Sequence, residues 1–207
     1  MKSGSIPCKA DPASQKEFLE NTIAVLISVA QRGEIALYYV DVAHFVLGAF
    51  LGYLWSKVRV FIRTPSGRQR YNVLGAYNAI TGTMVSVTNT TYINSSSVVE
   101  LLGKLSLLHP DGAVKVVLDN AAYQRCYWVR AFAHLLGIEI IFLPSYSPNL
   151  NLIERLWKFF KKKILYNKYY EKFEDFLSAC KGFFRCRTKY REELRSFLTE
   201  NFHRYQN

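Results

Sequence analysis

The sequence predicts an α/β protein built on a mixed five-stranded sheet that is flanked by helices, with extra helices at the C-terminus. Three apolar runs rich in strand-forming residues, 35–42, 114–119 and 138–143, are typical of strands buried on both faces. A hairpin pattern lies between the first two runs, and a helical pattern follows the hairpin and each later run. This order of elements is that of a sheet with helices on its faces.

The remaining elements are predicted in chain order from caps, turns and periodicity. Residues 1–13 form an extended lead-in, and a helix over 14–32 ends at Gly33. After the first strand, residues 45–62 are interpreted as a loop with short strand pieces. The later elements are a basic turn at 64–70, hairpin strands 71–79 and 83–88 joined through 80–82, and helices 94–108 (capped by one of the serines 95–97), 122–136, 147–163, 173–187 and 190–202.

Composition favours one hydrophobic core and a polyanionic partner. Half of the 207 residues are hydrophobic, which is enough for one substantial core. The net charge is +11, and residues 155–207 hold 14 Lys and Arg against 6 Asp and Glu, so this segment alone carries +8. Nucleic acid is the commonest partner of such a localised basic excess, and a solvated basic face is the alternative interpretation.

Several classes of protein are disfavoured. The four cysteines show neither a C-x-x-C pair nor partner-histidine spacing, so we expect reduced thiols without a zinc site or a disulfide framework. The longest apolar stretch, 45–55, is too short to cross a membrane, and residues 1–12 lack the apolar core of a signal peptide. We expect a cytoplasmic, nucleoid-associated protein with no membrane partner.

The predicted helix at 147–163 carries an unusual surface. Its apolar residues recur at helical spacing, and Glu154 in the first turn heads a row of lysines at 158, 161 and 162. Taken alone, Asn151 and Glu154 resemble a capping box, and Glu154 with Lys158 resembles an ordinary ion pair.

Two aspartates suggest a functional interpretation of Glu154. Asp41 is predicted at the end of the first strand and Asp119 at the end of the next parallel strand, so both are expected at one edge of the sheet. The short connection 144–147 returns the helix that carries Glu154 to the same edge. Three converging carboxylates repel one another unless divalent cations neutralise them, and two Mg²⁺ or Mn²⁺ ions would suit phosphodiester cleavage or joining.

Each aspartate also has a purely structural interpretation. Asp119 could cap the helix that follows its strand, and Asp41 could be a buried acid that a basic group pairs. Capping explains neither Asp41 nor the 34 residues that separate Asp119 from Glu154.

Asp41, the Asp119-Asn-Ala121 strand end and the motif Ser147-Pro-x-Leu-Asn-x-Ile-Glu154 together resemble the DDE catalytic domain of mariner-like transposases, in particular their bacterial insertion-sequence branch. The resemblance extends from about residue 35 to 164. It implies an RNase H-like fold of the retroviral-integrase type, with Asp41, Asp119 and Glu154 as catalytic metal ligands. It also implies Mg²⁺-dependent nicking at element ends and strand transfer into target DNA, commonly at a TA dinucleotide, by a homodimer or larger assembly.

The chain departs from the pattern of the family at two positions. Val42 stands where many relatives have an acidic residue, and Gln124 stands where they have a histidine. The segment 14–32 is also too short for the helix-turn-helix region that usually precedes the catalytic domain. A separately encoded helix-turn-helix partner, a fragment and a domesticated remnant are the open explanations, and the domains expected are 1–33, 34–166 (catalytic) and 167–207 (basic helical extension).

Other residues are assigned supporting roles. His44 is near the expected site and is interpreted mainly as structural, and Asn120, Gln124 and Asn151 are expected around the metal ligands or as caps. An RNase H-like nuclease without strand transfer and an inactive DNA-binding remnant are the alternative functions. The residues expected to contact DNA are Arg63, Arg68, Arg70, Lys158, Lys161, Lys162 and Lys163.

Overall fold

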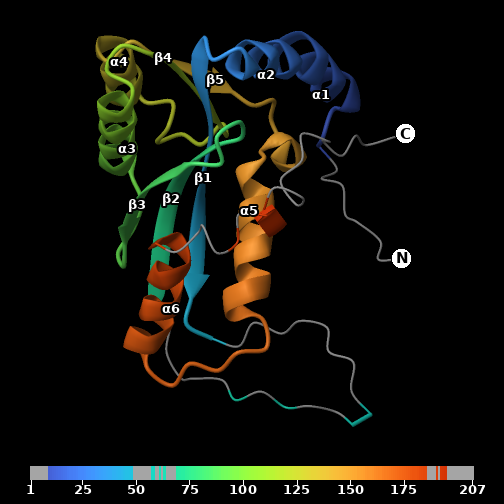
Figure 1. The fold of residues 1–207 in the computed structure, drawn as a ribbon, viewed down its shortest axis with the longest axis vertical. Coiled ribbons are helices and arrows are strands. Elements are labelled where there is room, and N and C mark those ends of the chain that lie inside the picture. Colours follow the sequence, from blue (N-terminus) through green and yellow to red (C-terminus); the bar gives the residue numbers. More distant parts are fainter. Residues whose placement is uncertain are drawn as a thin grey trace.

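A computed structural model describes residues 9–48, 57–58, 61, 63, 69–185, 190 and 192–194. Its centre is a five-stranded sheet in the order β3-β2-β1-β4-β5, with helices on both faces (Figure 1). β1, β4 and β5 are parallel, whereas β2 is antiparallel to both of its neighbours. The predicted mixed sheet is therefore confirmed. The strands are β1 (Ile35–Val46), β2 (Arg70–Asn78), β3 (Met84–Asn89), β4 (Ala113–Leu118) and β5 (Ile138–Phe142).

β1 is longer than predicted. The sequence placed its end at residue 42 and a loop from residue 45, but β1 continues to Val46. The parallel partner β4 pairs with β1 only as far as Tyr39, while antiparallel β2 pairs with it up to Val46. Pairing with β2 thus continues β1 beyond the residue where its pairing with β4 ends. Most of the predicted loop 45–62 and of the turn 64–70 lies outside the described residues.

The N-terminal helical segment begins at Pro12, earlier than predicted, because Asp11 caps it by accepting hydrogen bonds from the backbone N–H groups of Ala13 and Ser14. It runs as α1 (Pro12–Phe18), a π turn η1 (Leu19–Ile23) and α2 (Ala24–Gln31). Gly33 follows with a positive φ of 78°, which terminates the segment as the sequence predicts.

Two further helices differ from the prediction at their starts. Asn94, not a serine, caps α3 (Ser95–Leu108), and it forms a capping box with Ser97. α4 (Tyr127–Leu135) begins five residues later than predicted because residues 121–125 form tight backbone turns instead. Cys126 precedes α4 in an extended conformation.

The segment after β5 is not one continuous helix. A 3-10 turn η2 (Pro148–Leu150) is followed by Asn151 in an extended conformation, and α5 (Ile153–Phe160) starts only after Leu152. A π turn η3 (Lys161–Leu165) then continues α5. The alternative interpretation as a capping box is wrong, because Asn151 Oδ1, which would accept the capping bond, has no hydrogen-bond partner among the described residues, and the amide nitrogen donates to the backbone carbonyl of Val40 on β1. This long-range bond holds the segment out of helical geometry.

At the C-terminus, α6 (Phe173–Arg185) confirms the first of the two predicted helices up to Arg185, and its predicted end at 187 lies outside the described residues. Of the second, predicted over 190–202, the structure describes Tyr190 and a helical stretch at 192–194. No helix among the described residues is both long and apolar enough to cross a membrane.

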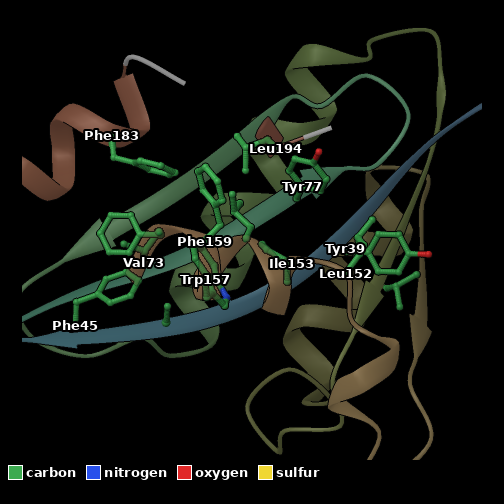
Figure 2. Close-up of a cluster of buried hydrophobic side chains, with 14 of the residues drawn as sticks. Tyr39, Phe45, Val73, Tyr77, Leu152, Ile153, Trp157, Phe159, Phe183 and Leu194 are labelled. Carbon is green, nitrogen blue, oxygen red and sulfur yellow. The ribbon is translucent and has the colours of Figure 1, made fainter. Parts of the chain in front are cut away.

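The sheet separates two hydrophobic cores. One lies beneath α3 and α4 and consists mainly of aliphatic residues such as Val98, Leu101 and Leu105. The other lies between the sheet, α5, α6 and the N-terminal helices and is rich in aromatic residues. Figure 2 shows this second core, in which Trp157 of α5 lies near Phe45 of β1 and Val73 of β2. α5 is thereby fixed against the centre of the sheet.

Candidate active site

Three elements bring the predicted carboxylates to one cleft of about 220 Å³. Asp41 lies on β1, two residues beyond the last residue that pairs with β4, and Asp119 directly follows β4. Glu154 is the second residue of α5. The cleft opens where the end of β4 leaves a gap beside the longer β1. Its other lining residues are Asn120, Ala121, Leu143, Pro144, Ser145, Tyr146, Ser147, Pro148 and Asn151.

Asp41 lies in an unfavourable environment for a negative charge. Burial, as the largest cause, and the nearby charges of Glu154 and Asp119 together raise the pKa of its carboxyl from 3.8 to about 7. The indole Nε1 of Trp157 donates a hydrogen bond of 2.9 Å to Asp41 Oδ2 and opposes the shift. Trp157, which the sequence assigned only to the core, therefore also positions an acid of the cleft.

Gly75 makes room for this tryptophan. It is the register partner of Asp41 on β2, and a Cβ atom at this position would lie 2.8 Å from the Trp157 ring and 2.7 Å from Met84. Only a glycine lets the indole lie this close to the strand. Sequence reasoning missed Gly75 because it stands inside an ordinary strand pattern.

Glu154 and Asp119 differ in their surroundings. Burial raises the pKa of Glu154, the positive charges of Lys158 and Lys161 lower it, and the charge of Asp119 raises it. Asp119 Oδ1 is buried and has no hydrogen-bond partner among the described residues. A carboxylate oxygen left unpaired in this way is poised to accept a cation or a donor from a ligand.

Of the three polar residues expected around the acids, Asn120 and Asn151 line the cleft, whereas Gln124 is not among its lining residues. Asn120 donates to the carbonyl of Leu143 and so links the ends of β4 and β5, with an N···O distance of 3.3 Å. Asn151 donates to the Val40 carbonyl at 3.0 Å and thus fixes the backbone next to Asp41. Gln124 is fully buried behind the cleft, and its amide nitrogen lies 3.4 Å from the hydroxyl of Tyr123.

Tyr123 is a second residue that the sequence did not reveal. Burial, as the largest cause, and the charges of Asp119 and Asp41 together raise its pKa to about 12. The hydroxyl therefore stays protonated beside the acids at neutral pH. His44, by contrast, alternates away from Asp41 along β1 and contacts Asn72 through a 2.7 Å Nδ1···Oδ1 hydrogen bond.

The N-terminal helix supports the loop at the mouth of the cleft. Gln15 is buried, and its amide nitrogen donates to the carbonyl of Tyr146 while its oxygen accepts from Asn149, at 3.5 and 3.0 Å. Tyr146 has a positive φ of 58°, which is uncommon for a residue other than glycine. Contacts from a segment more than 130 residues away in the chain thus secure this loop.

With this geometry described, comparison with known proteins decides the family. Residues 36–177, which contain all three carboxylates, match the family described as DDE superfamily endonuclease. The chain belongs to this family. The match extends from β1 to α6, so it covers more than half of the chain.

Solved structures show that this DDE endonuclease has the fold of a transposase catalytic domain. The catalytic domain of Mos1 mariner transposase superimposes with a TM-score of 0.57 at 15% identity, covering 98% of this chain and all of that one. The mariner Mos1 paired end complex with Mg gives a TM-score of 0.63 at 15% identity, covering all of this chain and 68% of that one. The predicted RNase H-like fold is confirmed.

A curated relative is the uncharacterized protein y4pE/y4sA of Sinorhizobium fredii (strain NBRC 101917 / NGR234). It is 28% identical to this chain over 90 residues, which make up 43% of this chain and 64% of that protein. The aligned segment thus spans less than two thirds of its length.

The predicted basic residues of the DDE endonuclease divide into several groups. Lys158 and Lys162 are exposed and Lys161 is partly exposed on and after α5. Lys163 points elsewhere, because its Nζ lies 2.5 Å from Glu193 Oε2 and 5.5 Å from the ring centre of Phe159. Arg63 and Arg70 are exposed, and Arg68 lies outside the described residues.

The donor set of the cleft fits a hard divalent cation. In the described part of the chain, no three His, Cys, Asp or Glu side chains lie close enough together to hold one ion. Mg²⁺, however, is usually held by one or two carboxylates together with water and substrate phosphates. The unpaired Oδ1 of Asp119 and the mutual repulsion that raises the pKa of Asp41 are what such an ion would relieve.

Proposed function

We propose that this DDE endonuclease is a transposase catalytic domain of the bacterial insertion-sequence branch, which cuts DNA at element ends and transfers the strand to target DNA. The observation that carries this proposal is the convergence of Asp41, Asp119 and Glu154 from three elements on one cleft. The family membership supports an endonuclease, and the shared fold with Mos1 transposase supports the transposition reaction.

Asp41, Asp119 and Glu154 would hold two Mg²⁺ or Mn²⁺ ions together. Bound ions of this kind stabilise the attacking and leaving oxygens of an in-line phosphoryl displacement. A Mos1 complex of the same fold was solved with Mg. Trp157 and Asn151 orient β1 and its acid, since one contacts the Asp41 carboxylate and the other the adjacent backbone.

The remaining protein groups position DNA. Lys158 and Lys161 lie near Glu154, where their charges would attract the phosphate backbone entering the cleft. Lys162, Arg63 and Arg70 are exposed cations suited to the same role. Lys163 is the weakest member of the predicted set because Glu193 already pairs with it.

The partners are the terminal inverted repeats of the element, target DNA at a TA dinucleotide, and a second copy of the chain. The paired end complex of Mos1 supports an assembly that holds two DNA ends. A separately encoded helix-turn-helix protein would supply recognition of the ends, and the protein would act at the nucleoid.

The test is cleavage of DNA that carries the element ends, in the presence of Mg²⁺ or Mn²⁺. Asp119→Ala and Glu154→Ala should each abolish nicking while circular dichroism shows an unchanged fold, whereas Asp111→Ala, on an exposed turn before β4, should cut normally. Normal cutting by either cleft variant would exclude the assignment. Joining of cut ends to target DNA distinguishes a transposase from a nuclease without strand transfer, and DNA binding without any cutting by the wild type would indicate an inactive remnant.

A further inference from the structure

A second hollow, of about 530 Å³, lies between α4 and β5, on the face of the sheet opposite α5. Three basic side chains, Arg125, Arg130 and His134, line it together with Ala133. Alternate residues of β5, namely Ile138, Ile140 and Phe142, form its apolar floor. We call this feature the α4–β5 groove.

The groove adjoins the cleft along two segments of the chain. Phe142 lines the groove and the next residue, Leu143, lines the cleft. On the opposite wall, Ala121 lines the cleft and Arg125 lines the groove, and the backbone N–H of Arg125 donates to the Ala121 carbonyl at 3.2 Å within a tight turn. Because Phe142 and Leu143 alternate to opposite faces of the sheet, a polymer strand that passes around the end of β5 would run from the cleft to the groove.

The charge of the groove is uncompensated. Residues 120–138 contain no Asp or Glu. Arg125 and Arg130 are exposed, and the ion pairs found among the described residues involve other cations. Of the two acids that border this segment, Asp119 lines the cleft and Glu139 pairs with Lys115 at 2.7 Å. The surface thus suits a polyanion.

Aromatic side chains border the same surface. Tyr127 is 87% exposed and Trp128 is 64% exposed at the start of α4. Tyr127, Arg130 and His134 are spaced i, i+3 and i+7, so they share one face of the helix. A basic groove with exposed aromatic rings is the arrangement by which proteins bind single-stranded nucleic acid, with cations on phosphates and rings on bases.

We propose that the α4–β5 groove binds single-stranded DNA that leaves the cleft, with Arg125 and Arg130 on its phosphates and Tyr127 stacked on a base. This inference rests on the proposed function, because it needs DNA in the cleft. It adds a DNA path across β5, opposite the lysines of α5, that the basic sequence motifs did not indicate.

The test measures the salt dependence of binding of the full chain to a fluorescently labelled, mixed-sequence single-stranded oligonucleotide in EDTA. Losing two phosphate contacts should reduce the slope of log K against log salt by about 1.4 in the double variant Arg125→Ala/Arg130→Ala. The control Arg32→Ala/Lys104→Ala removes the same charge from cations that pair with Glu34 and Glu100, and its slope should match the wild type. Equal slopes in all three proteins, or equal losses in both variants, would overturn the proposal.

Stacking is tested separately with two substitutions of one exposed residue. Tyr127→Ala should weaken binding by about fivefold or more, whereas Tyr127→Phe, which keeps the ring, should bind as the wild type does. Equal affinity of the alanine variant would remove the stacking role.

The omission of metal separates this proposal from the proposed function. A chain that binds through the groove but never cuts DNA keeps the groove as a binding site for single-stranded DNA, and overturns the transposase assignment together with the path from the cleft. A chain that cuts normally but shows no change of slope in Arg125→Ala/Arg130→Ala keeps the assignment and overturns the groove. An altered oligomeric state of that variant in size-exclusion chromatography, with an unchanged slope, would identify the surface as a contact between proteins and also overturn the proposal.

Discussion

Along β1, alternate side chains enter two different environments. Tyr38 and Val40 pack beneath α3 and α4, whereas Tyr39, Ala43 and Phe45 pack beneath α5 and α6. Asp41 falls on the second side by alternation, and Asp119 follows Val117 onto it in the same way. The acids of the cleft are therefore inserted at the edge of only one of the two described cores, the one beneath α5 and α6.

The two cores differ in composition accordingly. Tyr38 is the only aromatic residue among the buried members of the core beneath α3 and α4, within the described residues. The core beneath α5 uses many large rings, among them Phe45, Trp157 and Phe160, with the Phe45 and Phe160 ring centres 4.3 Å apart. Large rings fill the space beside the acids, and one of them also hydrogen-bonds an acid. We therefore expect substitutions on the first face to alter stability, and those on the second to alter stability and activity in different directions.

The largest stability effect is expected on the α3 face. Leu105 is fully buried, and Leu105→Ala should lower the free energy of unfolding by about 2–5 kcal/mol through lost burial and a residual cavity. The metal-dependent activity of the molecules that remain folded should be unchanged. Leu107→Ala on the same helix is the control, because Leu107 is 84% exposed. Denaturant titration measures the stability, and a loss of specific activity in folded Leu105→Ala would break the distinction between the faces.

Asp41→Asn should raise the free energy of unfolding, whereas Leu105→Ala lowers it. The folded-state pKa of Asp41, about 7, exceeds its ordinary value of 3.8, so the folded protein binds a proton that the unfolded chain releases between these values. The free energy of unfolding of the metal-free protein therefore falls as pH rises through this window and stays low above it.

Asparagine lacks the negative charge that the Asp41 carboxylate carries once it has lost its proton. Asp41→Asn in EDTA should therefore be more stable than the wild type at pH 8, by an amount on the order of a few kcal/mol, and the difference should shrink toward pH 4. Urea titrations at both pH values measure it, with Asp111→Asn as an exposed control. A variant less stable than the wild type at pH 8 would contradict the assigned cause of the pKa shift.

Gly75→Ala should lower both the stability and the cleavage activity. The added methyl group would overlap the Trp157 ring and Met84, and relieving this overlap should cost about 1–3 kcal/mol and displace the indole from Asp41. Gly103→Ala in α3, where no atom lies within 4 Å of the added Cβ, should be neutral or slightly stabilising. Thermal unfolding and a cleavage assay on both variants measure the difference, and normal activity in Gly75→Ala would show that Trp157 does not position Asp41.

Gln15→Ala should give the smallest effect. It removes two hydrogen bonds to the loop at the mouth of the cleft and should lower stability by about 1 kcal/mol, with a several-fold loss of turnover. Lys16→Ala, at the exposed neighbouring position, is the control. If turnover is unchanged while stability falls, the N-terminal helix supports the fold but not the site.

The sequence predicted the five strands because each is an apolar or alternating run between turn residues. It also predicted that Asp41, Asp119 and Glu154 lie near one another, because parallel strands share an edge. It failed where a distant contact overrides a local pattern. Asn151 and Glu154 match a local capping box, yet the Asn151 amide is bonded to Val40 on another element.

Other features have no local signal at all. Residues 45 and 46 fall in the predicted loop, and their pairing with β2 makes them part of β1. Gly75 becomes informative once Trp157 is known to lie over it. The bonds of Gln15 to Tyr146 and Asn149 join residues more than 130 positions apart, which no periodicity can reveal.

Mn²⁺ binding tests the central claim, that the three carboxylates form a metal-dependent centre, most directly. Isothermal calorimetry and the thermal midpoint should be measured as Mn²⁺ is added to the wild type, Asp119→Asn and the surface control Glu139→Gln. The wild type and the control should bind Mn²⁺ and unfold at higher temperature as its concentration rises, because the ion binds the folded state preferentially. Asp119→Asn should lose both responses, since it removes the charge of the carboxylate whose Oδ1 is buried and unpaired within the described structure. Equal binding by the wild type and Asp119→Asn, or no binding by the wild type, would contradict the account.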